Sequence, residues 1–250
     1  MFNEPLFYLT SVPAVLIYGV AKGGFGGAVA MVAVPLMALA MPPTQAAAIL
    51  LPILVVMDLV VVKTYWGIFD RRALRLLMLP ALLGISLGYL AADSMNEHYV
   101  RLLIGILSLA FGVQNLFGLT SRASREHHRG GATVYGTLAG FTSFNIHAGG
   151  PPFTMYLMPK QLTPLLFAGT AGIFFAVVNA VKLLPYYYLG QFSSENLVYS
   201  LALVPLAPLG VKIGHLLVQR SDPGFYYRLI SFFMVAVGLK LLYDGVTGLL

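Results

Sequence analysis

The chain has 250 residues, of which 58% are hydrophobic and 10% charged, and it carries a formal net charge of +6 with no cysteine. A soluble domain of this size has about 25% charged residues, so the composition predicts an all-α polytopic membrane protein in contact with a lipid bilayer. The lack of cysteine excludes disulfides, thiol catalysis and cysteine-ligated metals. The positive charge lies in short loops, as in membrane proteins, and does not indicate a nucleic-acid partner.

Residues 1–120 form the first expected membrane repeat. The start of the chain lacks the basic region of a signal peptide, so its first apolar segment is expected to be retained. Two apolar runs flank a glycine-rich break, and Pro42-Pro43 then stops one helix and starts the next. The expected segments are Phe7–Val20, Ala28–Met41, Gln45–Trp66, Arg71–Ala92 and Tyr99–Leu119.

Residues 121–131 are a basic loop, expected to be cytoplasmic, and residues 132–250 form the second expected membrane repeat. A break rich in glycine and proline again interrupts the first apolar region of this repeat. The expected segments are Val134–Phe144, Phe153–Met158, Leu165–Leu189, Glu195–Leu217 and Phe225–Val246.

The two halves resemble each other at nearly constant separation. Gly67-Ile68-Phe69 matches Gly190-Gln191-Phe192, and Asp58 falls close to the register of Asn179. Such weak internal symmetry is typical of transporter folds. We therefore expect two homologous halves, each with a glycine-broken first helix followed by three full spans. The distribution of Arg and Lys favours inverted over parallel repeats.

The two breaks are the candidate functional elements. Glycine inside a helix costs about 1 kcal/mol relative to alanine, and a lysine deep in a bilayer costs about 2.5–3.5 kcal/mol. One interpretation is a substrate site, because transporters build such sites from broken helices. The alternative is a purely structural one, in which the glycines line a helix crossing and the lysine extends to the membrane interface. The candidate substrate-binding residues are Lys22, Gly23, Gly24, Gly26, Gly27, Asn145, His147, Gly149, Gly150, Asn179 and Lys182.

Asp58 is expected to face the protein interior close to Lys22 or Lys182, as a coupling residue or a structural ion pair. The sequence offers no catalytic constellation, metal site or cofactor motif. His127 and His128 are expected in a solvated loop, and a metal site there lacks further ligands.

A small anion is the ligand that these elements favour. Amides near Gly26-Gly27 and Gly149-Gly150 could donate to it, because helices expected to start at Ala28 and Pro151 present their positive ends to the breaks. Two other functions stay open: a membrane-embedded enzyme acting on an apolar substrate, with Asp58 and His147 as its acid–base pair, and a passive anion channel.

The chain also resembles the TauE/SafE family of sulfite and organosulfonate exporters over nearly its whole length. The motifs that carry the resemblance are Lys22-Gly23-Gly24-Phe25-Gly26-Gly27, Val34-Pro35-Leu36, Met57-Asp58, His147-Ala148-Gly149-Gly150-Pro151-Pro152 and Val178-Asn179-Ala180-Val181-Lys182. The resemblance implies a secondary transporter of sulfite-like or sulfonate-like anions in a bacterial cytoplasmic (inner) membrane. Phe25 splits the family's more usual glycine run. The sequence leaves open the exact anion, the direction of transport and whether copies associate into a homo-oligomer.

Overall fold

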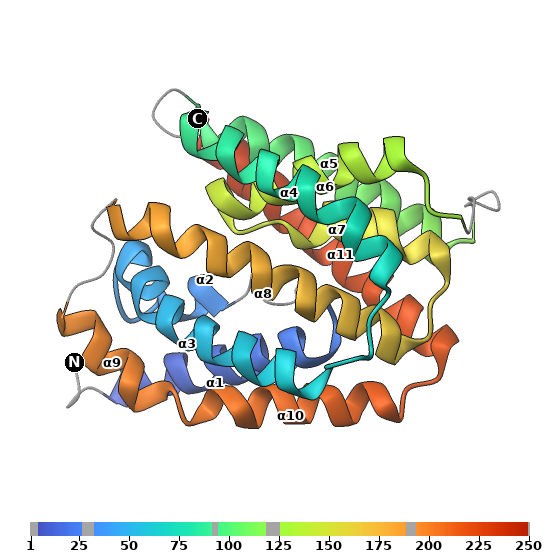
Figure 1. Ribbon diagram of the computed structural model, residues 1–250. Coiled ribbons are helices and arrows are strands. Elements are labelled where there is room, and N and C mark those ends of the chain that lie inside the picture. Colours follow the sequence, from blue (N-terminus) through green and yellow to red (C-terminus); the bar gives the residue numbers. More distant parts are fainter. Residues whose placement is uncertain (1–4, 27–32, 92–94, 119–125, 189–193, 250) are drawn as a thin grey trace.

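The computed structural model describes residues 5–26, 33–91, 95–118, 126–188 and 194–249, and every regular element in these ranges is helical (Figure 1). This confirms the all-α class. The elements are α1 (Pro5–Gly24), α2 (Ala33–Met37), α3 (Pro43–Thr64), α4 (Arg71–Ala91), α5 (Glu97–Leu116), α6 (Arg129–Ile146), α7 (Gly150–Leu157), the 3-10 turn η2 (Met158–Lys160), α8 (Pro164–Tyr188), α9 (Ser194–Leu203), α10 (Leu206–Gln219) and α11 (Pro223–Thr247).

Several described helices have the length and apolar character of membrane spans. Five qualify by these criteria (α1, α4, α5, α8 and α11), and the number rises to six if α9 and α10 form one bent span. A helix of about 20 apolar residues matches the roughly 30 Å hydrocarbon core of a bilayer. The chain is therefore a multi-pass membrane protein.

Helix α4 shows how both faces of such a helix are used. Leu79, Leu83, Leu87 and Leu90 follow helical spacing and are exposed. The opposite face is buried in the protein and carries the small residues Ala81, Gly84 and Gly88. A helix that is apolar on all sides belongs in lipid, because in water its leucine face would be exposed at a large free-energy cost.

The helices pack in pairs that cross between the two halves of the sequence. Helix α1 packs along α10, α4 along α6, α5 along α11, and α3 along α8. In Figure 1, α3 runs from left to right and α8 from right to left, while α4 runs from right to left and α10 from left to right.

Glycines bring three of these pairs into backbone contact, and in the α5–α11 pair a Cβ built on Gly238 would lie 2.6 Å from the Leu109 amide nitrogen. A Cβ built on Gly23 of α1 would lie 2.2 Å from the Val211 carbonyl oxygen of α10, and one on Gly140 of α6 would lie 2.0 Å from the Ala81 carbonyl oxygen of α4. Alanine does not fit at either position without moving a backbone. Small residues at such crossings are the usual device of packed membrane helices.

The span expected at Glu195–Leu217 is corrected by the structure. It is divided into α9 and α10, which meet at an angle of 45° across a turn at Val204-Pro205. Proline lacks an N–H, and its ring collides with the carbonyl group four residues earlier, so it breaks a helix interior.

Loops from both halves meet at one end of the molecule. His127 Nε2 lies 2.9 Å from Asp70 Oδ2, and the Tyr227 hydroxyl donates to the Leu162 carbonyl oxygen at 2.7 Å. The His127 side chain is only 10% exposed, so its expected place in a solvated loop was wrong. It ties the segment after α5 to the start of α4.

Candidate functional site

The first break begins later than the sequence suggests. Helix α1 continues through Lys22, Gly23 and Gly24, and the chain turns at Phe25 and Gly26. The cost of glycine in a helix is outweighed here because only glycine permits the close crossing with α10. Gly26 has a φ of +66°, a left-handed conformation that glycine adopts without strain.

Two parts of the first break remain expectations. Gly27 and the proposed helix start at Ala28 lie outside the described residues, and the next described helix, α2, begins at Ala33. The amides proposed there as anion donors are therefore not placed.

The carbonyl groups freed at the end of α1 are held by two tyrosines. The Tyr65 hydroxyl donates to the Gly23 carbonyl oxygen, and the Tyr226 hydroxyl donates to that of Gly24 at 2.7 Å. Tyr65 follows α3 and Tyr226 lies at the start of α11, and both are fully buried. A buried helix end needs such partners, since its last carbonyl groups lack intrahelical donors. The Gly23 and Gly24 carbonyl groups at this break are thus hydrogen-bonded within the protein.

Lys22 lies in the last turn of α1 and forms an ion pair with Asp58 of α3. Its ammonium group also lies 3.3 Å from the Leu54 carbonyl oxygen, and Asn179 Nδ2 of α8 donates to Asp58 Oδ2 at 2.9 Å. The expected proximity of Asp58 to Lys22 is confirmed. Because both charged side chains are buried, each depends on the other for compensation.

The second break is a sharp corner between α6 and α7. His147 ends α6 with a φ of +53°, and its side chain is exposed. The Thr142 hydroxyl lies 2.9 Å from the Ala148 carbonyl oxygen, and the Ala148 amide donates to the Thr142 carbonyl oxygen at 3.0 Å. These contacts fix the corner, so that Gly149 and Gly150 enter α7 directly.

The polar groups of this second break serve different purposes. Asn145 Nδ2 donates to the Phe141 carbonyl oxygen of its own helix at 3.0 Å. A Cβ built on Gly88 of α4 would lie 2.7 Å from the same Nδ2 atom. Asn145 is therefore part of the α4–α6 packing. A Cβ on Gly149 would lie 2.7 Å from the Ala139 carbonyl oxygen. Gly149 is needed for the fit of the corner whatever else it does.

Lys182 of α8 reaches the end of α6. Its ammonium group donates to the carbonyl oxygen and to the hydroxyl of Ser143, each at 3.0 Å. Lys182 also lies within electrostatic range of Lys22, Asp58 and His147. One network of polar groups thus links both breaks through α8.

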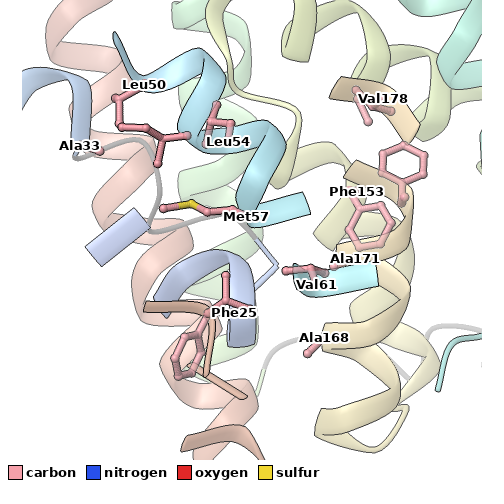
Figure 2. Close-up of a cluster of buried hydrophobic side chains, with 14 of the residues drawn as sticks. Phe25, Ala33, Leu50, Leu54, Met57, Val61, Phe153, Ala168, Ala171 and Val178 are labelled. Carbon is pink, nitrogen blue, oxygen red and sulfur yellow. The ribbon is translucent and has the colours of Figure 1, made fainter. Parts of the chain in front are cut away.

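Aromatic rings fill the space between the breaks on the other side of this network. Phe25 stacks on Tyr226 at 5.8 Å, Tyr226 contacts Phe167 at 5.9 Å, and Phe167 contacts Phe153 of α7 at 6.3 Å between ring centroids. Figure 2 shows this apolar region, in which Val61 of α3 points toward Ala171 of α8. The two breaks approach the same helix, and this part of the space between them is packed.

Three charged side chains are buried among those that the structure describes. Among the residues whose side chains the structure describes, the charged ones that are buried are Lys22, Lys182 and Asp58, with exposed fractions of 6%, 2% and 6%. Two lysines thus accompany one aspartate at apolar depth. Buried charges are costly unless other charges or polar groups lie close to them.

Sequence reasoning missed Ser143, Tyr65 and Tyr226. Ser143 precedes the second break by two residues, and this closeness to the break was the only feature of the sequence that indicated a role for it. The tyrosines lie far from the first break in sequence, and nothing in their local pattern indicates their role.

In the described ranges, no group of three or more His, Asp or Glu side chains is arranged to hold a metal ion. The two buried lysines, Lys22 and Lys182, suit an anion better than a cation.

Comparison with known proteins gives one match. No curated protein and no solved structure matches the chain. The family described as "Sulfite exporter TauE/SafE" matches residues 11–241, a range that includes most of α1, both breaks and Lys182. The chain belongs to the TauE/SafE sulfite exporter family of membrane transporters.

Proposed function

We propose that the chain is a secondary transporter of small sulfur-containing anions, sulfite or an organosulfonate, and that it works as an exporter in a bacterial cytoplasmic membrane. The substrate binds in the polar network between the two breaks. The proposal rests on the family and, above all, on the two buried lysines, Lys22 and Lys182, that lie near each other among the described side chains.

The two buried lysines point to the chemistry of the ligand. A monovalent anion beside Lys182 and Lys22 would lie next to two buried cationic side chains. A sulfur oxyanion offers several acceptor atoms, which matches a site made of ammonium groups and amides. Helix α7 adds the amides of Gly149 and Gly150, since Pro151 and Pro152 have no N–H to donate.

The candidate residues divide into two roles in this proposal. Lys22, Lys182, Asn179, His147 and the start of α7 face the anion, because they are polar and meet around α8. Gly23 and Gly24 act differently, since α10 covers them. Their role is to let Lys22 sit at the end of a closely packed helix.

We further propose that the two halves are inverted repeats. The exchange of α1 with α6, α3 with α8, α4 with α10 and α5 with α11 maps the α1–α10 pair onto the α6–α4 pair, and leaves the α3–α8 and α5–α11 pairs as they are. The opposite directions of α3 and α8 support an axis in the membrane plane (Figure 1). In this symmetry Asp58 and Asn179 are counterparts, and they hydrogen-bond to each other.

A flux assay tests the function. Purified protein in liposomes is loaded with sulfite or methanesulfonate, and efflux is compared with that of chloride. We expect sulfur-anion flux that saturates and is lost in Lys182→Gln, while Lys63→Gln, an exposed lysine on α3, leaves flux unchanged. Equal flux of chloride and the sulfur anions would contradict the substrate class, and conductance that does not saturate would favour a channel.

A further inference from the structure

We infer that Asp58 acts as a built-in competitor of the transported anion, so that binding of a monovalent anion is coupled to uptake of a proton by Asp58. The inference rests on the proposed function. It starts from the ion pair that Asp58 forms with Lys22.

The geometry makes the aspartate a substitute for substrate. The Asp58 carboxylate forms an ion pair with an ammonium group through Oδ1 and accepts a hydrogen bond from an amide through Oδ2. A sulfonate group would make the same two kinds of contact. Because the side chains of Lys22 and Asp58 are 6% and 9% exposed, water offers little alternative compensation, and an anion and the charged carboxylate compete for Lys22.

Protonation of Asp58 removes this competition, because a neutral carboxyl group no longer pairs with the Lys22 ammonium group. The pair of carboxylate and ammonium, one proton and one monovalent anion become a neutral carboxyl group and an ammonium–anion pair. No charge is added to the buried site. Asn179 can serve both forms, since its amide also carries an oxygen that accepts a hydrogen bond from a carboxylic acid once the amide group turns over.

The charged surroundings of Asp58 come from two helices packed on α3. Burial disfavours the charged carboxylate, whereas the cations Lys22 on α1 and Lys182 on α8 favour it. Tyr65 follows the end of α3. Its hydroxyl donates to the Gly23 carbonyl oxygen, and its ring packs on that of His215 of α10 with the ring centroids 4.9 Å apart. An anion bound to the lysines removes their support for the carboxylate, and this is the physical origin of the coupling.

The test uses methanesulfonate, whose own charge does not change in the pH range of interest. Binding to purified protein is measured by calorimetry at several pH values and in buffers of different ionisation enthalpy. We expect the wild type to take up a proton with each anion, and its affinity to fall by up to about tenfold per pH unit as the pH rises. In Asp58→Asn, affinity should be independent of pH and at least equal to that of the wild type at acid pH.

Asp244→Asn is the matched control. Asp244 also pairs with a lysine, Lys240, but on the surface, and its variant should keep the wild-type pH dependence. Wild-type binding without proton uptake would overturn the coupling and leave the proposed function standing. Unchanged pH dependence in Asp58→Asn would overturn it too. Absence of binding in the wild type at every pH would overturn the proposed function and the coupling with it. The buffer comparison needs no variant, so a folding defect in Asp58→Asn cannot obscure the result.

Discussion

Replacing Gly23 with alanine should destabilise the protein by preventing the α1–α10 crossing. The added Cβ would lie 2.2 Å from the Val211 carbonyl oxygen, 2.8 Å from its Cα and 2.9 Å from its carbonyl carbon. Carbon atoms in contact settle at about 3.5–4.0 Å, so the helices must separate by roughly 1 Å. Forcing an extra methyl group into a packed interior costs about 1–3 kcal/mol. The gain of alanine over glycine in a helix, about 1 kcal/mol, offsets part of this.

The assay is thermal unfolding in detergent, followed by the fraction of protein that remains monodisperse after heating. Gly130→Ala is the control, because it also lies in a helix and a Cβ there would meet nothing within 4 Å. We expect Gly23→Ala to unfold at a lower temperature than both Gly130→Ala and wild type. Val211→Ala should not rescue it, since the colliding atoms belong to the backbone. Equal stability of Gly23→Ala and wild type would refute the close crossing.

At the α3–α8 contact the atom that would collide with an added methyl group belongs to a side chain, not to the backbone. A Cβ on Gly172 would lie 2.3 Å from Val61 Cγ1, a side-chain atom. Gly172→Ala should therefore be destabilised, and the double variant Gly172→Ala/Val61→Ala should recover most of the loss in the same assay. A failure to recover would mean that backbone atoms limit this contact as well.

Three further predictions follow from the site and the arrangement of the loops. Lys22→Leu should cost about 3–5 kcal/mol in unfolding free energy because it strands a buried carboxylate, and adding Asp58→Asn should restore much of it; additive losses would argue against the pair. Tyr226→Phe should cost about 1–3 kcal/mol, since the Gly24 carbonyl group loses its donor, and an unchanged unfolding temperature would contradict that role. In this cysteine-free chain, a cysteine at Gln161 should react with an impermeant thiol reagent from the cytoplasm and one at Thr247 from the opposite side, whereas labelling of both from one side would contradict the topology.

The sequence predicts the helices well because their signals are local. Apolar length and the proline pair at Pro42-Pro43 each act within a few residues, and apart from the division at Pro205 the structure has helices where they indicate. Asp58 was also expected correctly, since a carboxylate at apolar depth needs a cation and few are available. Burial and charge together restrict such a group to very few partners.

The rest depends on contacts between distant segments. Gly23 and Gly24 look like helix breakers until α10 is placed against them, because the propensity scale does not include close approach. His127 looks solvated until Asp70 is folded onto it. Ser143 becomes significant only when Lys182 reaches it from α8. In each case the deciding neighbour lies tens of residues away or more.

The backbone contact between α1 and α10 has a mechanical consequence. Helices separated by a layer of side chains can slide, because rotamers change as they move. At Gly23 and Gly214 each helix instead lies in a notch of the other, with a Cβ on Gly214 only 2.3 Å from the Val20 carbonyl oxygen. Sliding would drive carbonyl groups into one another, so this pair moves as one rigid block. A motion that opens the interior must then occur between helices whose contact is made by side chains, such as α3 and α8 at Val61.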